Sequence, residues 1–291
     1  MISLKEGHKT FVEHLTKQGK SSATLTAYNK DIEQLIKHLE NEGLVLVNEI
    51  QTTHLEVFMQ GLSDKKYTAK SISRKTNATK TFFKFLKENN HITENVSTAL
   101  KHPKLDSKAP RILSKIEYRA LRDAARHDLR SYAMVEVLLQ TGITISEISE
   151  MEMKHIEIKN GEGNLFVPKK NNKDSRNIPL NKAVVEVLTK YIETERPKME
   201  KAIHLFVTKT GNSLLVRNIR STIDRYFKSA GISKAKVNDL RHTFVAYHLA
   251  QGVNILKLSR IAGHKRVSTT EKYLAYIEKV ESTEKAELIA L

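Results

Sequence analysis

The chain has 291 residues, 40% of them hydrophobic, which is enough material for about two globular domains. Its 49 Lys and Arg against 33 Asp and Glu leave a net charge of +16, so we expect a polyanionic partner, with nucleic acid ahead of an anionic membrane surface. The absence of long apolar runs excludes an integral membrane protein, and the absence of cysteine excludes disulfides and thiolate chemistry. The opening MISLKEGHKT has no secretory apolar region, so we expect a cytoplasmic protein.

Residues 1–101 are predicted to form an N-terminal helical domain, because apolar residues recur there at helical spacing between turn signals. The four helices are expected around Phe11, from Ser21 to the Gly43 region, after Thr52, and from about Thr68 to Leu86. The last of them carries a basic face that we predict to contact phosphates, although a solvated helix face is an equally good interpretation. This face comprises Lys70, Arg74, Lys75, Lys80 and Lys84.

Residues 102–111, HPKLDSKAPR, combine two prolines with basic side chains and little apolar content. This composition predicts an extended basic linker and a domain boundary. The second domain, residues 112–291, is predicted to be mostly α with a small antiparallel β-sheet. Its helices are expected to begin at Ser114 and to cover 132–139, 146–151, 183–192, 216–229, 239–251, 255–262 and 269–280, and its strands lie near 156–158, 165–168 and 176–180.

Two short strings in the last third of the chain carry the chemistry. They are NDLRHTF over 238–244 and AGH over 262–264, the latter followed by STTEKY over 268–273. A single Arg, His or Tyr in a basic protein is most often a surface or packing residue. Together, however, the strings resemble two motifs of the tyrosine recombinase (phage integrase) family, which has HxLRHTF, then GH, then a tyrosine at this separation.

The resemblance covers almost the whole chain. KKNNKDSRNIPL from Lys169 resembles the family's lysine-bearing β-hairpin, 141–151 resembles its first catalytic box, and 71–86 resembles the last helix of its N-terminal core-binding domain. In length the chain is similar to Xer-like enzymes and to TnpI-like transposon resolvases. The resemblance implies a two-domain clamp on duplex DNA that acts as a tetramer on paired recombination sites, in integration, excision or resolution.

The resemblance also assigns roles. Tyr273 would attack a DNA phosphodiester and form a 3′-phosphotyrosine, which stores the bond energy so that no cofactor, nucleotide or metal is needed. Arg241 would hold the phosphate and His264 would donate a hydrogen bond to it, because negative charge builds up on the phosphoryl oxygens in the transition state. Lys170 would protonate the departing 5′ oxygen. The absence of GxxxxGK[ST] and HExxH motifs fits this chemistry.

Two positions depart from the family's pattern. Thr144 stands in TGITISE where the family has its first catalytic arginine, and Asn238 stands where a histidine is usual. A neutral hydroxyl is a poor substitute for a guanidinium at a phosphoryl transition state. Three explanations remain open for Thr144: another arginine that takes over, an engineered inactive variant, or a DNA-binding relative that does not cleave.

The sequence leaves the nucleophile and the hairpin lysine with rivals. Tyr276 lies three residues beyond the family's tyrosine spacing, and Lys169 and Lys173 compete with Lys170.

A topoisomerase of type IB would share the phosphotyrosine chemistry. The tail 282–291 has an apolar edge that could seat on a neighbouring protomer. The residues expected to contact DNA are Arg74, Lys75, Lys80, Lys104, Lys108, Arg111, Lys173, Lys265 and Arg266.

Overall fold

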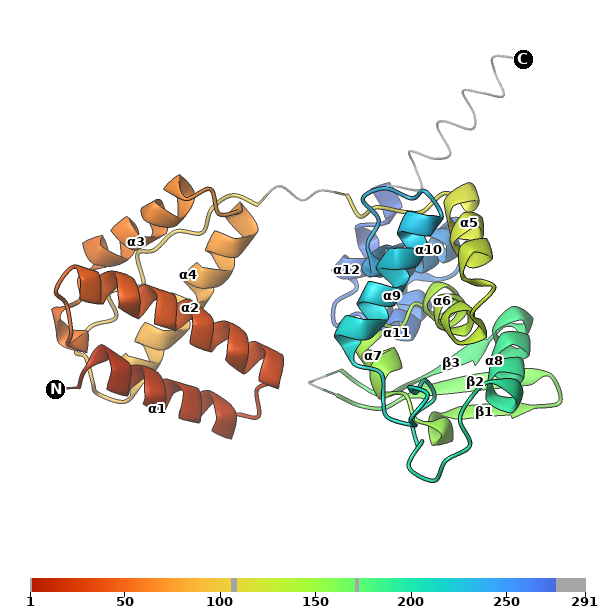
Figure 1. Cartoon of the computed structure of the whole chain (residues 1–291). Helices are drawn as coiled ribbons and strands as arrows, with labels where there is room; N and C mark the ends of the chain where they lie inside the picture. The colour runs from red at the N-terminus through yellow and green to blue at the C-terminus, as the bar shows by residue number, and fades with distance from the viewer. Residues whose placement is uncertain (1, 106–108, 171–172, 276–291) are drawn as a thin grey trace, which may run out of the picture. The chain divides into compact units, whose positions relative to one another are not determined.

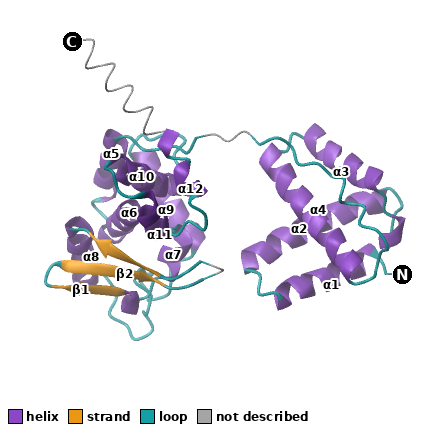
Figure 2. Cartoon of the chain, turned by 180° about the vertical axis from the view of Figure 1, so that it is seen from behind, coloured by secondary structure: helices purple, strands orange, loops and turns teal. Residues whose placement is uncertain are grey.

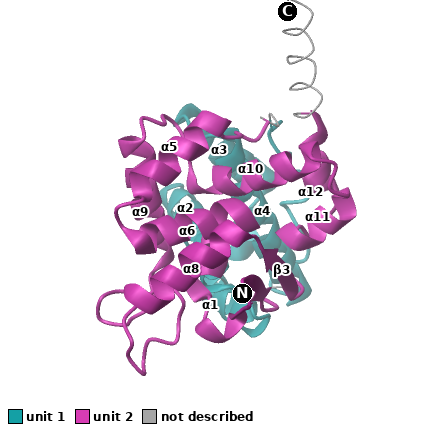
Figure 3. Cartoon of the chain, turned by 90° about the vertical axis from the view of Figure 1, so that its right-hand side faces the viewer, with its two compact units in different colours: residues 1–107 teal, residues 108–291 magenta. Residues whose placement is uncertain are grey.

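A computed structural model describes residues 2–105, 109–170 and 173–275. The chain divides into two compact units, Met1–Ser107 and Lys108–Leu291, coloured separately in Figure 3. Both units are mainly helical, and the second contains one small antiparallel sheet (Figures 1 and 2), which confirms the predicted fold class. Among the described helices none is both long and apolar enough to cross a bilayer.

The described residues of the first unit, 2–105, form four α-helices and one short 3-10 turn. They are α1 (Leu4–Lys17), α2 (Ser22–Asn41), the 3-10 turn Val47–Glu49, α3 (Thr52–Asp64) and α4 (Ala69–Glu88). The side chains of Ser3, Ser21 and Thr68 accept hydrogen bonds from backbone N–H groups at the starts of α1, α2 and α4, so local capping sets these boundaries. The rings of Phe11 and Phe82 meet edge-on in the core, with centroids 5.3 Å apart.

The basic face of α4 differs from the prediction at Lys75. This residue is only 5% exposed, and its ammonium lies 2.8 Å from the carboxylate of buried Asp31. Lys75 follows Ile72 by three residues and precedes Thr79 by four, so helical spacing places it on the core-facing side. Arg74, one position earlier, also pairs with Asp31 but stays about half exposed. The prediction that Lys75 points outward was therefore wrong.

The second unit surrounds a central helix with further helices and one sheet. In chain order it contains α5 (Lys115–Ala125), α6 (Leu129–Thr141), α7 (Ile145–Glu150), the 3-10 turn Met153–His155, β1 (Ile156–Lys159), β2 (Glu162–Val167) and β3 (Arg176–Leu180). It continues with α8 (Lys182–Thr194), α9 (Val216–Ser229), α10 (Val237–Ala250), α11 (Ile255–Ala262) and α12 (Ser268–Glu271). The strands pair antiparallel in the order β1-β2-β3, with Leu165 opposite both Ile156 and Ile178.

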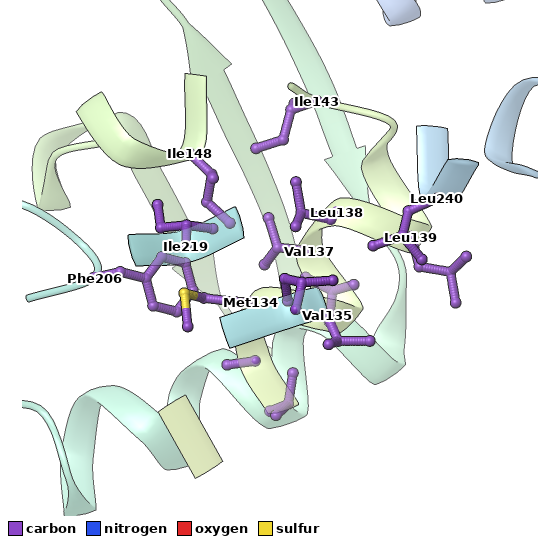
Figure 4. Close-up of a cluster of buried hydrophobic side chains, with 14 of the residues drawn as sticks. Met134, Val135, Val137, Leu138, Leu139, Ile143, Ile148, Phe206, Ile219 and Leu240 are labelled. Carbon is purple, nitrogen blue, oxygen red and sulfur yellow. The ribbon is translucent and has the colours of Figure 1, made fainter. Parts of the chain in front are cut away.

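Helix α6 is apolar around most of its circumference, as expected of a helix enclosed by other elements. Figure 4 shows Met134, Val137 and Leu138 of α6 among side chains from other elements, including Ile219 of α9 and Leu240 of α10. This packing fixes the end of α6, where Gly142 takes the left-handed conformation with φ 65°. A Cβ at Gly142 would lie 2.3 Å from the ring of Phe244, so only glycine fits.

The last predicted helix, 269–280, is interrupted. Helix α12 ends at Glu271, and the N–H of Tyr273 donates to the carbonyl of Thr270 at 3.1 Å in a tight turn. Thr270 is fully buried and its hydroxyl bonds to His264, which holds this turn in place. Residues 276–280, the rival Tyr276 and the tail 282–291 lie outside the described residues.

Candidate active site

The hydroxyl of Tyr273 is enclosed by the helices of the second unit. Tyr273 is 4% exposed, and its oxygen lies 2.5 Å from Nδ1 of His242 on α10. Burial raises the pKa of Tyr273 above its ordinary value, and the nearby charge of Arg241 opposes that rise. The phenol is therefore protonated at neutral pH, and it must give up its proton before it can act as a nucleophile.

Arg241 lies one position before His242 on α10. It is 8% exposed and donates from Nη1 to the carbonyl of Gly142 at 2.5 Å. Within the described residues no carboxylate comes within 4.0 Å of its guanidinium. Burial lowers the pKa of Arg241, but a guanidinium remains charged at any physiological pH. The site thus contains a buried positive charge with several free donors, as a phosphate ligand requires.

His264 follows Gly263, which ends α11 in the left-handed conformation with φ 69°. Its Nδ1 lies 2.7 Å from the hydroxyl of Thr270, and its ring is parallel to that of Tyr273, with centroids 6.5 Å apart. Burial and the charge of Arg241 lower the pKa of His264 to about 4, so the ring is neutral at pH 7. When Thr270 donates to Nδ1, the proton of the ring is on Nε2, which is then the donor for a phosphate oxygen.

Arg176, at the start of β3, connects the sheet to the site. Its guanidinium makes a two-pronged ion pair with Glu147 at 3.1 and 3.0 Å, and its Nε donates to the carbonyl of Ile261 at 2.8 Å. A Cβ on Gly263 would lie 2.8 Å from this guanidinium, so a glycine is required there. Burial acts to raise the pKa of Glu147, but hydrogen bonds from Arg176 and Thr144 outweigh it and hold the pKa at about 2.

Thr144, at the position of the missing arginine, begins α7. Its hydroxyl accepts the N–H of Glu147 at 3.3 Å, and its own N–H donates to the Glu147 carboxylate at 2.8 Å. It lines a pocket of about 470 Å³ together with Arg220, Asn238 and Arg241. Thr144 thus lines the same pocket as Arg241, and its side chain caps α7.

Lys170 and Lys173, on the hairpin between β2 and β3, contact different carboxylates. Lys170 pairs with Glu150 and is about half exposed. Lys173 lies across a backbone bridge from Lys170, and its ammonium is 3.6 Å from Glu147. It also lines a pocket of about 670 Å³ with Arg176 and His264. In this structure Lys173, one of the rivals that the sequence leaves open, is the lysine beside His264.

Sequence reasoning placed Asn238 in the site, and its amide nitrogen lies 2.8 Å from Nε2 of His242. It did not assign roles to three residues that the structure adds to the cluster, although all three lie inside the motifs: His242, Arg176 and Glu147. Their position inside the quoted motifs is the signal that could have found them.

The residues expected to contact DNA differ in exposure and in whether their charged groups already bond to other protein groups. Lys104, Lys265 and Arg266 are exposed. Arg111 pairs with Glu117 and also donates to the Ser233 carbonyl at 2.5 Å, and Lys80 donates to the Thr98 carbonyl at 3.2 Å. Lys108 lies outside the described residues. In the described parts of the chain no group of three or more His, Asp or Glu side chains is arranged to hold a metal ion.

Both units of the chain resemble known proteins. A family model described as the phage integrase family matches residues 108–279, and a model described as the phage integrase N-terminal SAM-like domain matches residues 9–90. The chain is 27% identical over 276 residues to the tyrosine recombinase XerC of Anoxybacillus flavithermus, which covers 90% of each protein.

Solved structures of recombinases also resemble this chain. The crystal structure of XerA recombinase is 27% identical, with a TM-score of 0.55 over 97% of this chain and 98% of that one. A lambda integrase tetramer bound to a Holliday junction shares the fold, with a TM-score of 0.74 at 19% identity over 91% of this chain and 78% of that one.

Proposed function

Because this chain belongs to the phage integrase family, we propose that Tyr273 is the residue through which it cleaves and rejoins duplex DNA at specific sites. The chain is a tyrosine site-specific recombinase. The assignment of Tyr273 rests on the position of its side chain. The residue is buried, its hydroxyl lies 2.5 Å from the His242 imidazole, and the positive charge of Arg241 is nearby. A phenol beside a hydrogen-bonding imidazole and a positive charge is well placed to attack an anionic phosphodiester.

Arg241 and His264 are the groups that meet the phosphate in this proposal. The attack adds negative charge to the phosphoryl oxygens, and a guanidinium with free donors stabilises that charge most strongly where water is excluded. His264 adds a neutral N–H donor from Nε2, because Thr270 occupies its Nδ1. The His264 ring lies parallel to the Tyr273 ring, with centroids 6.5 Å apart.

The proton for the departing 5′ oxygen comes from the hairpin between β2 and β3. The sequence favours Lys170, whereas the position of Lys173 beside His264 and Glu147 favours Lys173. Both flank the same turn. Alanine variants of each separate them, because a 5′-phosphorothiolate leaves without a proton and restores cleavage only to the variant that lacks the general acid.

The positive charge that Thr144 does not provide has a candidate source in Arg220. This arginine lies on α9, is exposed, and lines the same pocket as Thr144 and Arg241. No hydrogen bond or ion pair ties it to another described residue. Asp224 and Lys236 also line the pocket, so Arg220 and Lys236 together outweigh one carboxylate. We assign Arg220 the role of second guanidinium toward the phosphate.

The partner in this proposal is a double-stranded recombination site, and the active assembly is a tetramer of this chain in the cytoplasm. The basic residues of 102–111 and the exposed Lys265 and Arg266 contact the DNA backbone. Such contacts position the protein, and the base sequence is read by other side chains in the grooves. The relatives named above include an integrase seen as a tetramer on a Holliday junction, which supports this assembly.

A selection experiment tests the proposed function. The chain is incubated with a library of duplexes that carry nicks, so that a short 5′-hydroxyl fragment diffuses away after cleavage and traps the covalent complex. DNA that remains attached to the protein after denaturation is then sequenced. We expect one enriched sequence with partial two-fold symmetry. Attachment without any sequence preference would indicate a relaxing topoisomerase, and binding without attachment would indicate a non-cleaving DNA-binding protein.

A further inference from the structure

The hydroxyl of Tyr273 has a single hydrogen-bond partner in the part of the chain that the structure describes. That partner is Nδ1 of His242, at 2.5 Å. His264 instead uses its Nδ1 for Thr270 and meets the phenol only through its parallel ring face. Since the phenol must lose a proton before its oxygen can bond to phosphorus, the group in contact with that oxygen decides where the proton goes.

Asn238 holds the far side of the His242 ring. The two residues are four positions apart on α10 and therefore lie on one face of the helix, with the Asn238 amide nitrogen 2.8 Å from Nε2 of His242. An asparagine amide offers N–H groups on one side and a carbonyl oxygen on the other, and a half-turn about its last bond exchanges them. When Nδ1 accepts the phenol, the proton of the neutral ring is on Nε2, and it stays there after Nδ1 is protonated. With its carbonyl oxygen turned toward Nε2, Asn238 can therefore accept that N–H in both charge states of the ring, which an apolar side chain cannot do.

We propose that His242 is the catalytic residue that accepts the proton of Tyr273, and that Asn238 is the positioning residue that holds the ring through its change of charge. The inference rests on the proposed function. As Tyr273 Oη bonds to phosphorus, its proton passes to Nδ1 and the bond from phosphorus to the 5′ oxygen breaks. The 5′ oxygen takes a proton from the hairpin lysine. When a 5′-hydroxyl rejoins, that hydroxyl returns its proton to the lysine, and Oη recovers its proton from Nδ1.

The surroundings of His242 suit a proton acceptor. The titratable and charged groups that face it are Asp239 and Arg241 on its own helix, His264 after α11 and Tyr273 after α12. Burial lowers the pKa of His242, Asp239 opposes this, and Arg241 adds to it. The ring is neutral at pH 7 and able to accept a proton. The same arrangement explains why Asn238 is tolerated where the family usually has a histidine, because the neighbouring turn of α10 provides the imidazole.

The test measures single-turnover cleavage of a nicked duplex between about pH 5 and pH 10 for the wild type and for His242→Gln. Glutamine keeps hydrogen-bonding atoms but cannot take up the proton. We expect the wild-type rate to level off above the pKa of His242, and the variant to be about 10²- to 10⁴-fold slower, with a rate that keeps rising with pH. His248→Gln is the matched control, because His248 lies on the same helix and its ring bonds only to the Phe244 carbonyl among the described residues.

Asn238→Asp tests the positioning role. A carboxylate next to Nε2 stabilises the charged ring, so we expect the acidic limb of the pH profile to move to higher pH, which a merely structural role would not produce. If His242→Gln does not fold, this shift decides the matter, and its absence overturns the inference. An unchanged rate and pH profile in folded His242→Gln also overturns it.

Two further outcomes separate the inference from the proposed function. Rescue of His242→Gln by a 5′-phosphorothiolate would place His242 on the leaving-group side and overturn the inference alone. No covalent product from the wild type would overturn the proposed function and the inference with it. A wild-type adduct together with a slow, unrescued His242→Gln and a normal His248→Gln supports both.

Discussion

Each unit of the molecule buries a cationic side chain, but the two cations are neutralised very differently. Lys75 in the first unit has the Asp31 carboxylate at 2.8 Å and the Gln34 amide oxygen at 2.6 Å. Arg241 in the second unit has the Gly142 carbonyl, and no carboxylate within ion-pair distance in the described structure. The first arrangement is complete without a ligand. The second leaves donors and charge available, at a cost in stability, to a group that arrives from outside.

This difference indicates where stability and function lie. A buried charge that is paired contributes to a unique fold, and removing its partner destabilises the protein strongly. A buried charge that lacks a counter-ion is tolerated where a ligand provides the opposite charge. The contrast is sharper because Glu147, the carboxylate whose charge acts on Arg241, is already paired with Arg176.

The largest expected effect is on catalysis at Arg241. Arg241→Met removes the guanidinium that meets the transition state, so we expect single-turnover cleavage to fall by about 10³- to 10⁵-fold. Because methionine also removes a charge without a buried counter-ion, the unfolding free energy of the DNA-free protein should stay the same or rise. Cleavage assays and denaturant unfolding measure the two effects. Strong destabilisation by Arg241→Met would show that the charge of Arg241, like that of Lys75, stabilises the fold through partners within the protein.

The next effect is a gain of activity at Thr144. Thr144→Arg places a second guanidinium beside Arg241 and should raise the single-turnover cleavage rate by about 10² or more, with little change in DNA affinity. The lost cap on α7 should cost about 1 kcal/mol of unfolding free energy. Thr144→Ser, which keeps a capping hydroxyl, is the control and should leave the rate unchanged.

Arg220 provides a check on this result. Arg220→Ala should slow the wild type by more than about tenfold and should slow the Thr144→Arg variant much less, since the introduced arginine takes over its role. Equal loss in both backgrounds would mean that Arg220 acts away from the phosphate. An unchanged rate in Thr144→Arg would mean that Arg220 already provides the second guanidinium in full.

Breaking the paired cation should change stability more than chemistry. Asp31→Asn leaves the ammonium of Lys75 buried without a counter-charge, so we expect a loss of about 3 to 5 kcal/mol in the unfolding free energy of the first unit. Arg74→Ala removes the half-exposed partner of the same carboxylate and should cost no more than about 1 kcal/mol. Denaturant unfolding measures both. A mild effect of Asp31→Asn would show that Lys75 finds other partners.

The smallest effect concerns pH and His264. Because the pKa of His264 is about 4 in the folded protein and 6.5 in its ordinary state, the unfolded chain binds more protons between these values. Stability therefore rises with pH across this range and is lost as the pH falls from 6.5 toward 4. His264→Asn should flatten this slope, as measured by unfolding at several pH values. An unchanged slope would mean that other groups produce it.

Local patterns in the sequence predicted most of the helices and strands. The apolar spacing located α9 at Val216–Ser229 and α11 at Ile255–Ala262 without error. Lys75 and α12 were harder, for physical reasons. The contact that neutralises buried Lys75 is with a carboxylate 44 residues away, and the end of α12 depends on a hydrogen bond between Thr270 and His264. Neither of these contacts has a local signature.

The site was predictable in its motif residues and unpredictable in its contacts. The resemblance of two short segments to the family's motifs singled out Tyr273, Arg241 and His264, and the structure brings them together. The contact of His242 with Tyr273 depends on how α10 packs against the turn after α12, which no sequence pattern specifies. The choice between Lys170 and Lys173 likewise depends on which carboxylate of α7 each one meets, Glu150 or Glu147.

The most direct test of the central claim is to identify the residue that becomes joined to DNA. The wild type is trapped on a nicked duplex of the selected site, digested with protease, and the DNA-linked peptide is sequenced by mass spectrometry. We expect the 3′-phosphate on Tyr273, no adduct from Tyr273→Phe, and normal DNA binding by that variant, because only the attacking oxygen is removed. A linkage at Tyr276, or an adduct that survives in Tyr273→Phe, would contradict the account.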